Sequence, residues 1–546
     1  MNYNNSIISV PLPQNEPQFS YAPNTKERDL LKSALKELKS QVIDIPLIIG
    51  GKEIRTGNKA KVVLPHNHKH ILAEYHKAGK EEVLLAVEES QKAWKEWQKL
   101  RYEERLSIFL KAAELLSTKY RYLLNAATML SISKNPYQAE IDSACELIDF
   151  WRFNCYYAQQ IYKEQPIYSP KGNWNYVQQR PLEGFVFAVT PFNFTAIGGN
   201  LPTSPAIMGN VVLWKPASSA VYAPYFIMKI LKEAGLPDGV INFIPGSANI
   251  VGDICLKHPL LAGIHFTGST AVFHKMWQDV GQNIATYKNY PRIVGETGGK
   301  DFIFAHSTAD IRKLVVALIR GAFEYQGQKC SAASRSYIPR SIWDKTWAMM
   351  KEELSKIKMG DVEDFTNLVN AVIDEKAFEN ITGYIEYTKS SKDAEIIFGG
   401  NYDNSVGYFI EPTVILAKKP DFKTMQEEIF GPVLTIYVYE DEKFEETLEI
   451  CDKTSPYALT GAIFANDRNI INIMMEKLEF AAGNFYINDK PTGAVVGQQP
   501  FGGGRASGTN DKAGSMLNLY RWVSTRAVKE NFVAPDEVGY PFMLDK

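Results

Sequence analysis

Apolar positions in the first part of the chain recur with the spacing of amphipathic helices. Between Lys26 and Lys39 the leucines fall on one helical face, and helical spacing predominates again from Lys80 to about Tyr162. Residues 1–25 are polar and rich in proline, which predicts an arm on the surface. Residues 165–182 are rich in Pro, Gly and Tyr, which predicts an extended hairpin.

From Phe185 the pattern changes to short, continuous apolar runs. These runs lie at 185–189, 211–214, 240–244 and 263–266, and they alternate with helix-length segments near 220–234, 247–257 and 270–283. Continuous rather than alternating runs are typical of parallel strands that are covered on both faces. The alternation predicts a doubly wound, nucleotide-binding α/β unit with right-handed crossovers.

A second α/β unit is predicted from Asp301 to about Asn484, with its boundary near Gly298–Gly299. Its strands are expected at 302–304, 335–338, 395–398, 433–438 and 461–464, and a helix is expected from Ile311 to Tyr325. The C-terminal tail is aromatic and alternates in places, which favours a strand at an interface.

Composition excludes several classes of protein. A chain of 546 residues is too long for one core, so two or three domains are expected. Lys+Arg 60 against Asp+Glu 62 leaves a net charge of -2, which argues against nucleic acid as a partner. Five cysteines at irregular spacing suggest reduced thiols. Met1 to Pro17 lacks a leader pattern and no apolar run is long enough for a bilayer, so a cytoplasmic protein without a membrane partner is expected.

Cys330 and Glu296 are the strongest candidates for chemistry. Small and polar residues surround Cys330, whereas the other four cysteines lie in apolar patterns that predict buried, inert thiols. Glu296 stands in Gly-Glu-Thr-Gly-Gly-Lys. A thiol can attack a carbonyl carbon and a carboxylate can activate the water that releases the acyl group, so the pair suggests covalent chemistry on an aldehyde.

Three further segments fit such an enzyme. Gly268, in Thr-Gly-Ser-Thr after a strand, predicts a phosphate site at a helix N-terminus, although a simple N-cap would have the same residues. Lys215 ends a strand before Pro216, where it is either a ribose ligand or a surface lysine. Asn193 follows a proline turn and offers a neutral N–H donor for an oxyanion, or is only a turn residue.

His66, His68 and His70 alternate as metal ligands on a strand would. No carboxylate or cysteine partner stands nearby, and the segment follows a polar turn. No metal is expected.

These motifs together resemble the aldehyde dehydrogenase superfamily, in the same order along the chain and over roughly residues 30–532. They are Thr-Pro-Phe-Asn-Phe around Asn193, Trp-Lys-Pro-Ala around Lys215, Phe-Thr-Gly-Ser at 266–269, Glu-Thr-Gly-Gly-Lys at 296–300, Gly-Gln-Lys-Cys at 327–330 and Glu-Glu-Ile-Phe-Gly-Pro at 427–432. The resemblance implies an α/β aldehyde dehydrogenase fold. It implies a Rossmann-type NAD-binding domain formed by residues 1–160 and 183–297, and a catalytic domain formed by residues 298–490. It also implies a small β oligomerisation flap formed by residues 161–182 and 505–546. Such a flap implies a homodimer or a dimer-based oligomer.

Several stretches resemble the branch of the superfamily that oxidises L-glutamate γ-semialdehyde. They are 138–142, 146–150, 192–201, 323–332, 482–489 and 496–503. The resemblance implies NAD-dependent oxidation of this small molecule, formed from 1-pyrroline-5-carboxylate in proline catabolism, to L-glutamate. Another semialdehyde, or a non-catalytic protein that keeps the fold, are the alternatives. Ser218 stands where many members have a glutamate on the adenosine ribose, which leaves NADP open.

The resemblance also implies a role for each matching residue. Cys330 would be the nucleophile, Glu296 the base, and Asn193 an oxyanion donor. The residues that would contact NAD are Thr190, Lys215, Gly268, Ser269, Thr270, Ala271, Val272, Glu428 and Phe430. The residues that would contact the substrate are Glu146, Phe194, Ser331, Gly493, Ala494 and Phe501, with Ser331 and the N–H groups of Gly493 and Ala494 on its carboxylate.

Overall fold

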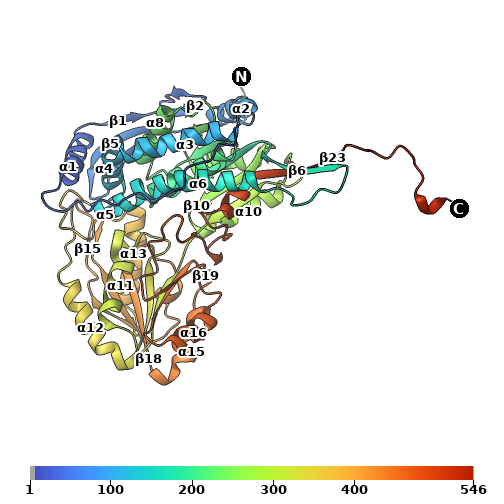
Figure 1. Cartoon of the computed structure of the whole chain (residues 1–546). Coiled ribbons are helices and arrows are strands. Elements are labelled where there is room, and N and C mark those ends of the chain that lie inside the picture. Colours follow the sequence, from blue (N-terminus) through green and yellow to red (C-terminus); the bar gives the residue numbers. More distant parts are fainter. Residues whose placement is uncertain (1–5, 545–546) are drawn as a thin grey trace.

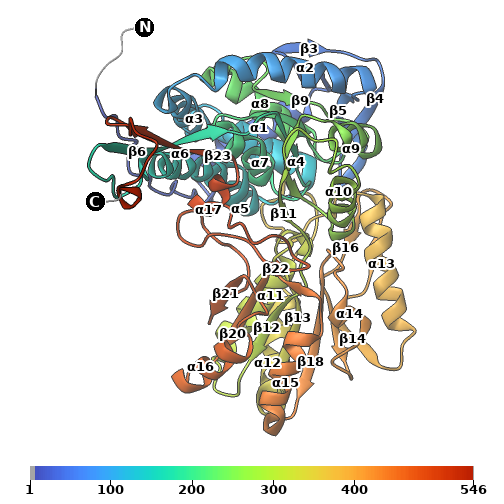
Figure 2. The same cartoon turned by 90° about the vertical axis from the view of Figure 1, so that its right-hand side faces the viewer.

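The computed structural model describes residues 6–544, which fold into two halves, each built around a seven-stranded sheet (Figure 1). Figure 2 shows the elements up to β11 in one half and those from β12 to β22 mostly in the other. The predicted boundary near Gly298 lies in the short connection between the two sheets.

The first sheet has the strand order β11-β10-β7-β8-β9-β2-β3. Its strands are β7 (Phe185–Val189), β8 (Val211–Lys215), β9 (Ile241–Phe243), β10 (Leu261–Thr267) and β11 (Arg292–Glu296), with β2 (Leu47–Ile49) and β3 (Lys52–Ile54) added antiparallel at one edge. The connecting helices are α7 (Thr195–Ile207), α8 (Tyr222–Ala234), α9 (Ala248–Lys257) and α10 (Thr270–Gln282). β7 to β11 are parallel, so the predicted doubly wound unit is confirmed.

The helical patterns before Phe185 are also confirmed. They form α1 (Lys26–Lys39), α2 (Lys80–Trp97), α3 (Tyr102–Ser117), α4 (Arg121–Ile132), α5 (Pro136–Ala139), the π-helix η1 (Glu140–Glu146) and α6 (Leu147–Lys163). The small sheet of β1 (Ile43–Ile45), β4 (Lys59–Leu64) and β5 (Asn67–His76) lies among them. A π-helix in a chain of α-helices often marks a functional region, because it aims side chains that regular winding would turn away.

The second sheet has the strand order β14-β17-β18-β13-β12-β20-β21. Its strands are β12 (Asp301–Ala305), β13 (Ala333–Pro339), β14 (Ala394–Phe398), β17 (Thr413–Ala417), β18 (Val433–Tyr439), β20 (Thr460–Phe464) and β21 (Asn484–Ile487), and the helices include α11 (Ile311–Phe323), α12 (Arg340–Leu354), α13 (Glu375–Lys389), α15 (Phe444–Lys453) and α16 (Arg468–Lys477). Successive residues of β12 enter opposite cores, with Phe302 and Phe304 on one face and Ile303 and Ala305 on the other. The predicted strands are confirmed.

The segment 165–182 differs from the expected hairpin. Its strand β6 (Asn173–Pro181) pairs instead with β23 (Val523–Asn531), antiparallel over nine residue pairs. This two-stranded ribbon projects from the body, and the C-terminal segment continues beyond it (Figure 1). The prediction failed because local composition indicates an extended strand but does not indicate its partner.

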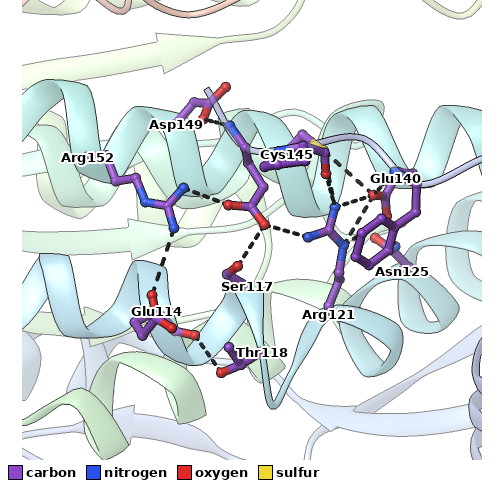
Figure 3. Close-up of polar contacts among 12 residues, drawn as sticks. Glu114, Ser117, Thr118, Arg121, Asn125, Glu140, Cys145, Asp149 and Arg152 are labelled. Carbon is purple, nitrogen blue, oxygen red and sulfur yellow. Dashed lines mark hydrogen bonds and ion pairs between the residues drawn. The ribbon is translucent and has the colours of Figure 1, made fainter. Parts of the chain in front are cut away.

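Residues 6–20, the described part of the N-terminal segment before Tyr21, lie mostly at the surface, as predicted, but they are anchored to the helices beneath them. Tyr21 is buried, and Glu16 accepts hydrogen bonds from Arg121 of α4 and Arg152 of α6. Figure 3 shows these two arginines directed toward the same point between the helices. Asn15 and Glu16, which are half-buried, and the buried Tyr21 have polar partners on the helices, which the polarity of the sequence alone does not reveal.

Candidate active site

A cavity of about 250 Å³ lies where the two halves meet. Cys330 lines it together with all six predicted substrate residues, which are Glu146, Phe194, Ser331, Gly493, Ala494 and Phe501. They come from η1, from the start of α7, and from loops of the second half. The structure thus brings together segments that are far apart in the sequence.

Cys330 follows a backbone held in an unusual conformation. Tyr325 and Gln326 have φ values of 50° and 54°, and Gly327 has a φ of 65°. A left-handed conformation at a non-glycine residue costs on the order of 1 to 3 kcal/mol, so surrounding contacts must hold it. Gln326 supplies two of them, since its side-chain amide donates to the carbonyls of Ser133, at 3.0 Å, and Ala371, at 2.8 Å.

The Cys330 thiol is half-buried, whereas the other four cysteines are buried, as predicted, and all five are free. Burial raises the pKa of the Cys330 thiol well above its ordinary value, and the nearby carboxylate of Glu296 raises it further. The resting thiol is therefore protonated, and attack on a carbonyl requires that its proton be taken up.

Asn193 connects the first half to the nucleophile loop. Its side-chain Nδ2 donates to the carbonyl of Gln328 at 3.0 Å, two residues before Cys330. Gln328 is itself held by Ile373, whose backbone N–H donates to its side-chain oxygen at 2.9 Å. An amide nitrogen carries two N–H bonds, so Asn193 has a second donor for an oxyanion.

Glu296 ends β11 and lines a separate cavity of about 30 Å³, which is large enough to hold a water molecule. Glu146 and Phe501 line both this cavity and the larger one. Burial raises the pKa of Glu296 to about 8, with Lys512 lowering it and Asp511 raising it. A carboxylate with this pKa can take a proton from water near neutral pH.

The turn between β10 and α10 lies directly beside Glu296. Gly268 N–H donates to the backbone carbonyl of Glu296 at 3.2 Å, and Ser269 is the N-cap of α10. A side chain at position 268 would approach the Phe266 ring to 2.7 Å. Ser269, Ala271 and Val272 are exposed in the first turn, where free backbone N–H groups favour a phosphate.

Thr190 and Lys215 lie on neighbouring strand ends of the first sheet. The Thr190 N–H donates to the carbonyl of Lys215 at 3.2 Å, and its hydroxyl accepts from the Trp214 indole at 3.0 Å. The Lys215 ammonium is buried and donates to the carbonyl of Pro216 at 3.1 Å. Burial lowers the pKa of Lys215 to about 8.

Glu428 and Phe430 face this region from the second half. One Glu428 carboxylate oxygen accepts from the Gly299 N–H at 2.9 Å, and burial raises the pKa of this carboxyl to about 7. Phe430 has a φ of 57° and meets the Phe192 ring edge-on at 5.7 Å between centroids. Both predicted NAD contacts therefore lie in segments that link the two halves.

Part of the wall of the larger cavity is polar. The hydroxyls of Ser331 and Thr492 lie 2.8 Å apart, and Gly493 has a φ of 100° that a residue with a side chain rarely adopts. Lys490 donates to the carbonyl of Thr492 at 2.9 Å. Lys490 and Lys329 also line the cavity, although sequence reasoning identified neither of them. Their positions next to Ser331 and Thr492 in the chain were the available signal.

A buried ion pair supports the other side of the cavity. The Lys134 ammonium donates to Asp142 at 2.7 Å, and both side chains are fully buried. Asp142 also accepts from the backbone N–H groups of Thr195 and Ala196, while Lys134 lies 4.1 Å from the centre of the Phe194 ring. The pair, which sequence reasoning missed, holds the start of α7 against η1.

The three histidines of 66–70 have separate partners. His66 Nδ1 lies 2.7 Å from Ser133 Oγ, while His68 and His70 bond the carbonyls of Asn404 and Lys39. Within residues 6–544, no group of three or more His, Cys, Asp or Glu side chains is arranged to hold a metal ion. No helix of the same residues combines the length and apolar character that crossing a membrane requires.

Known proteins resemble this chain over nearly its whole length. The model of the aldehyde dehydrogenase family matches residues 54–528, so the chain belongs to the aldehyde dehydrogenase family. It is 56% identical to the mitochondrial delta-1-pyrroline-5-carboxylate dehydrogenase of Dictyostelium discoideum over 539 residues, 98% of this chain and 97% of that protein. It is 52% identical to the delta-1-pyrroline-5-carboxylate dehydrogenase of Agaricus bisporus, over 99% of each chain.

Solved structures agree as well. The crystal structure of delta-pyrroline-5-carboxylate dehydrogenase from Mycobacterium tuberculosis bound with NAD superposes with a TM-score of 0.96 at 50% identity. The match covers 99% of this chain and all of that one. The predicted aldehyde dehydrogenase fold is thereby confirmed.

Proposed function

We propose that this chain is the NAD-dependent dehydrogenase that oxidises L-glutamate γ-semialdehyde, formed from 1-pyrroline-5-carboxylate in proline catabolism, to L-glutamate. One observation carries the proposal: the cavity that Cys330 lines is also lined by Ser331 and Thr492, which bear hydroxyls, and by Gly493 and Ala494. A volume of about 250 Å³ suits a five-carbon substrate. Relatives above half identity with the corresponding name support it.

The chain's own residues suit NAD. The N-terminus of α10, with Gly268 and Ser269, would receive the pyrophosphate, and the buried Lys215 ammonium would donate to a ribose hydroxyl. Glu428 would accept from the other ribose. Thr190, Thr270, Ala271, Val272 and Phe430 would complete the contacts. NAD, when bound, supplies the hydride acceptor.

The proposed reaction follows from the three catalytic side chains. The Cys330 thiol gives its proton to water and its sulfur bonds to the aldehyde carbon, while the C=O π bond breaks to leave an oxyanion that receives hydrogen bonds from Asn193 Nδ2 and the Cys330 N–H. The C=O bond forms again as hydride leaves that carbon for the acceptor that NAD would supply, which leaves a thioester on Cys330. Glu296 then takes a proton from water, whose oxygen bonds to the thioester carbon as the C–S bond breaks; the carboxylic acid is released and the Cys330 thiolate regains a proton.

Substrate recognition is proposed to rest on both ends of the cavity. Ser331 and the N–H groups of Gly493 and Ala494 would bind the carboxylate, with Lys490 and Lys329 adding positive charge nearby. Phe194 and Phe501 would flank the carbon chain. Glu146, whose pKa burial raises well above its ordinary value, would meet the amino group and regain its charge there.

A substrate panel tests the proposal. Wild-type protein should reduce NAD with glutamate semialdehyde at a higher kcat/KM than with succinate semialdehyde or propanal. Ala494→Pro removes one N–H and should raise the KM for glutamate semialdehyde about tenfold, equivalent to about 1.4 kcal/mol, with little effect on propanal. Equal losses for both aldehydes, or a preference for another semialdehyde, would reject the assignment.

Assembly, domain boundaries and compartment are part of the same proposal. Exposed apolar side chains lie on the ribbon of β6 and β23, as Trp174 does, and directly after it, as Phe532 and Val533 do. They favour a homodimer formed through residues 161–182 and 505–546. Light scattering of the wild-type chain tests whether it is a dimer.

Residues 1–160 with 183–297 would form the domain that binds NAD, and residues 298–490 would form the domain that carries Cys330. Five free thiols favour a reducing compartment, the cytoplasm or the interior of the mitochondrion, which fluorescence microscopy of the tagged chain would distinguish.

A further inference from the structure

Residues 15–18, here called the N-terminal strap, form part of the substrate cavity. Asn15, Glu16 and Gln18 line it together with Cys330. The strap lies outside residues 54–528, which the family model matches. The contacts of the strap within this chain indicate its role.

Asn15 uses its whole side-chain amide to join two walls of the cavity. Nδ2 donates to the carboxylate of Asp149 on α6 at 2.8 Å and to the carbonyl of Val496 at 2.8 Å. Its oxygen accepts from the side chain of Gln498 at 3.0 Å. Val496 and Gln498 belong to residues 492–499, here called the carboxylate loop, which includes Gly493 and Ala494.

The middle of the carboxylate loop has few polar contacts with the first half other than those of Asn15. Its turn is closed internally, since the N–H groups of Gln498 and Gln499 donate to the Val495 carbonyl at 3.0 Å. Thr492 holds one end through Ser331, at 2.8 Å. Asn484 holds the other through the Pro500 carbonyl, at 3.0 Å. Val496 is buried in the hydrophobic core of the first half and Gly497 lies against the Phe153 ring of α6. Asn15 supplies the polar contacts that, together with this packing, tie the middle of the loop to the first half.

The strap itself is firmly anchored. The Glu16 N–H donates to Asp149 at 2.7 Å, and the Glu16 carboxylate accepts from Arg121 at 2.5 Å and Arg152 at 2.6 Å. Arg121 also bonds the buried Glu140 of η1, so that the labelled side chains of α4, η1 and α6 converge (Figure 3). Buried charges with several partners move little, because separation would leave them unpaired. Asn15 is thus held in place before substrate arrives.

We propose that Asn15 is a positioning residue for substrate recognition, which places the carboxylate loop at the distance from Cys330 that a five-carbon semialdehyde requires. The inference rests on the proposed function. Asn15 acts through Val496 and Gln498, whereas the loop's own N–H groups meet the substrate.

The test compares Asn15→Ala with wild type on glutamate semialdehyde and propanal. We expect the KM for glutamate semialdehyde to rise about tenfold, equivalent to about 1.4 kcal/mol, with kcat lowered less than threefold and propanal kinetics unchanged within about twofold. Tyr102→Phe is the matched control, because its hydroxyl bonds the carbonyl of Ile8 in the same N-terminal segment at 3.2 Å, away from the cavity. It should leave all constants unchanged. If the Asn15→Ala variant does not fold, Asn15→Ser, whose side chain is smaller than that of Asn but still polar, takes its place in the same comparison.

A double-mutant cycle with Gln498→Ala separates positioning from general weakening. If Asn15 acts through the loop, the combined loss in kcat/KM is smaller than the product of the single losses. A combined loss in kcat/KM equal to the product of the single losses would overturn the inference while leaving the proposed function intact. An equal loss in kcat/KM for both aldehydes would do the same. A wild type that does not favour glutamate semialdehyde would instead reject the proposed function, and the inference with it.

Discussion

Glu296 should give thioester hydrolysis a steep dependence on pH. Burial raises its pKa to about 8, and only the ionised carboxylate can take a proton from water. With a pKa of about 8, roughly one Glu296 in eleven is ionised at pH 7, so hydrolysis there should run at about a tenth of its limit. The rate should rise about tenfold per pH unit below pH 7 and level off above about pH 9.

Two neighbouring charges allow this pKa to be moved in opposite directions. Lys512 lowers the pKa of Glu296 and Asp511 raises it. Removing either charge removes its effect on the Glu296 carboxylate. Lys512→Met should therefore shift the midpoint upward, and Asp511→Asn should shift it downward.

The assay follows NADH by stopped flow from pH 6 to pH 10. The burst reports formation of the thioester and the later steady rate reports its hydrolysis, so the midpoint is taken from the steady rate where a burst is present. Glu296→Gln should keep a burst near one NADH per subunit, with a slow and pH-independent steady rate. Midpoints that move in the same direction in both charge variants, or a Glu296→Gln steady rate within tenfold of wild type at pH 9, would refute the assignment.

Two further substitutions test the nucleophile and the buried ion pair. Cys330→Ala should abolish turnover on glutamate semialdehyde while NAD binding, followed by protein fluorescence, stays within about threefold; turnover above a few per cent would contradict the role of the thiol. Lys134→Met leaves Asp142 buried without its cation and should lower the free energy of unfolding in urea by about 3 to 5 kcal/mol, whereas adding Asp142→Asn should recover part of that loss. A loss below about 1 kcal/mol would show that the pair contributes little.

The strands of both sheets and the residues around Cys330 could be predicted from local patterns. A parallel strand covered on both faces needs a continuous apolar run, so runs such as 185–189 and 211–214 indicate strands without knowledge of their neighbours. Cys330, Glu296 and Gly268 are likewise recognisable because each needs particular residues immediately beside it, such as the glycines that allow a close backbone approach.

Only the tertiary structure showed which residues far apart in the sequence contact each other. Asn15 meets Val496 across 481 positions of sequence, and Gln178 of β6 pairs with Arg526 of β23 across 348. The polarity of residues 1–25 predicted a surface position, but it did not indicate that the Glu16 side chain would be held between Arg121 and Arg152. Local periodicity specifies which face of an element is buried. It does not specify which distant charge will neutralise a buried one, since that depends on how the elements pack in three dimensions.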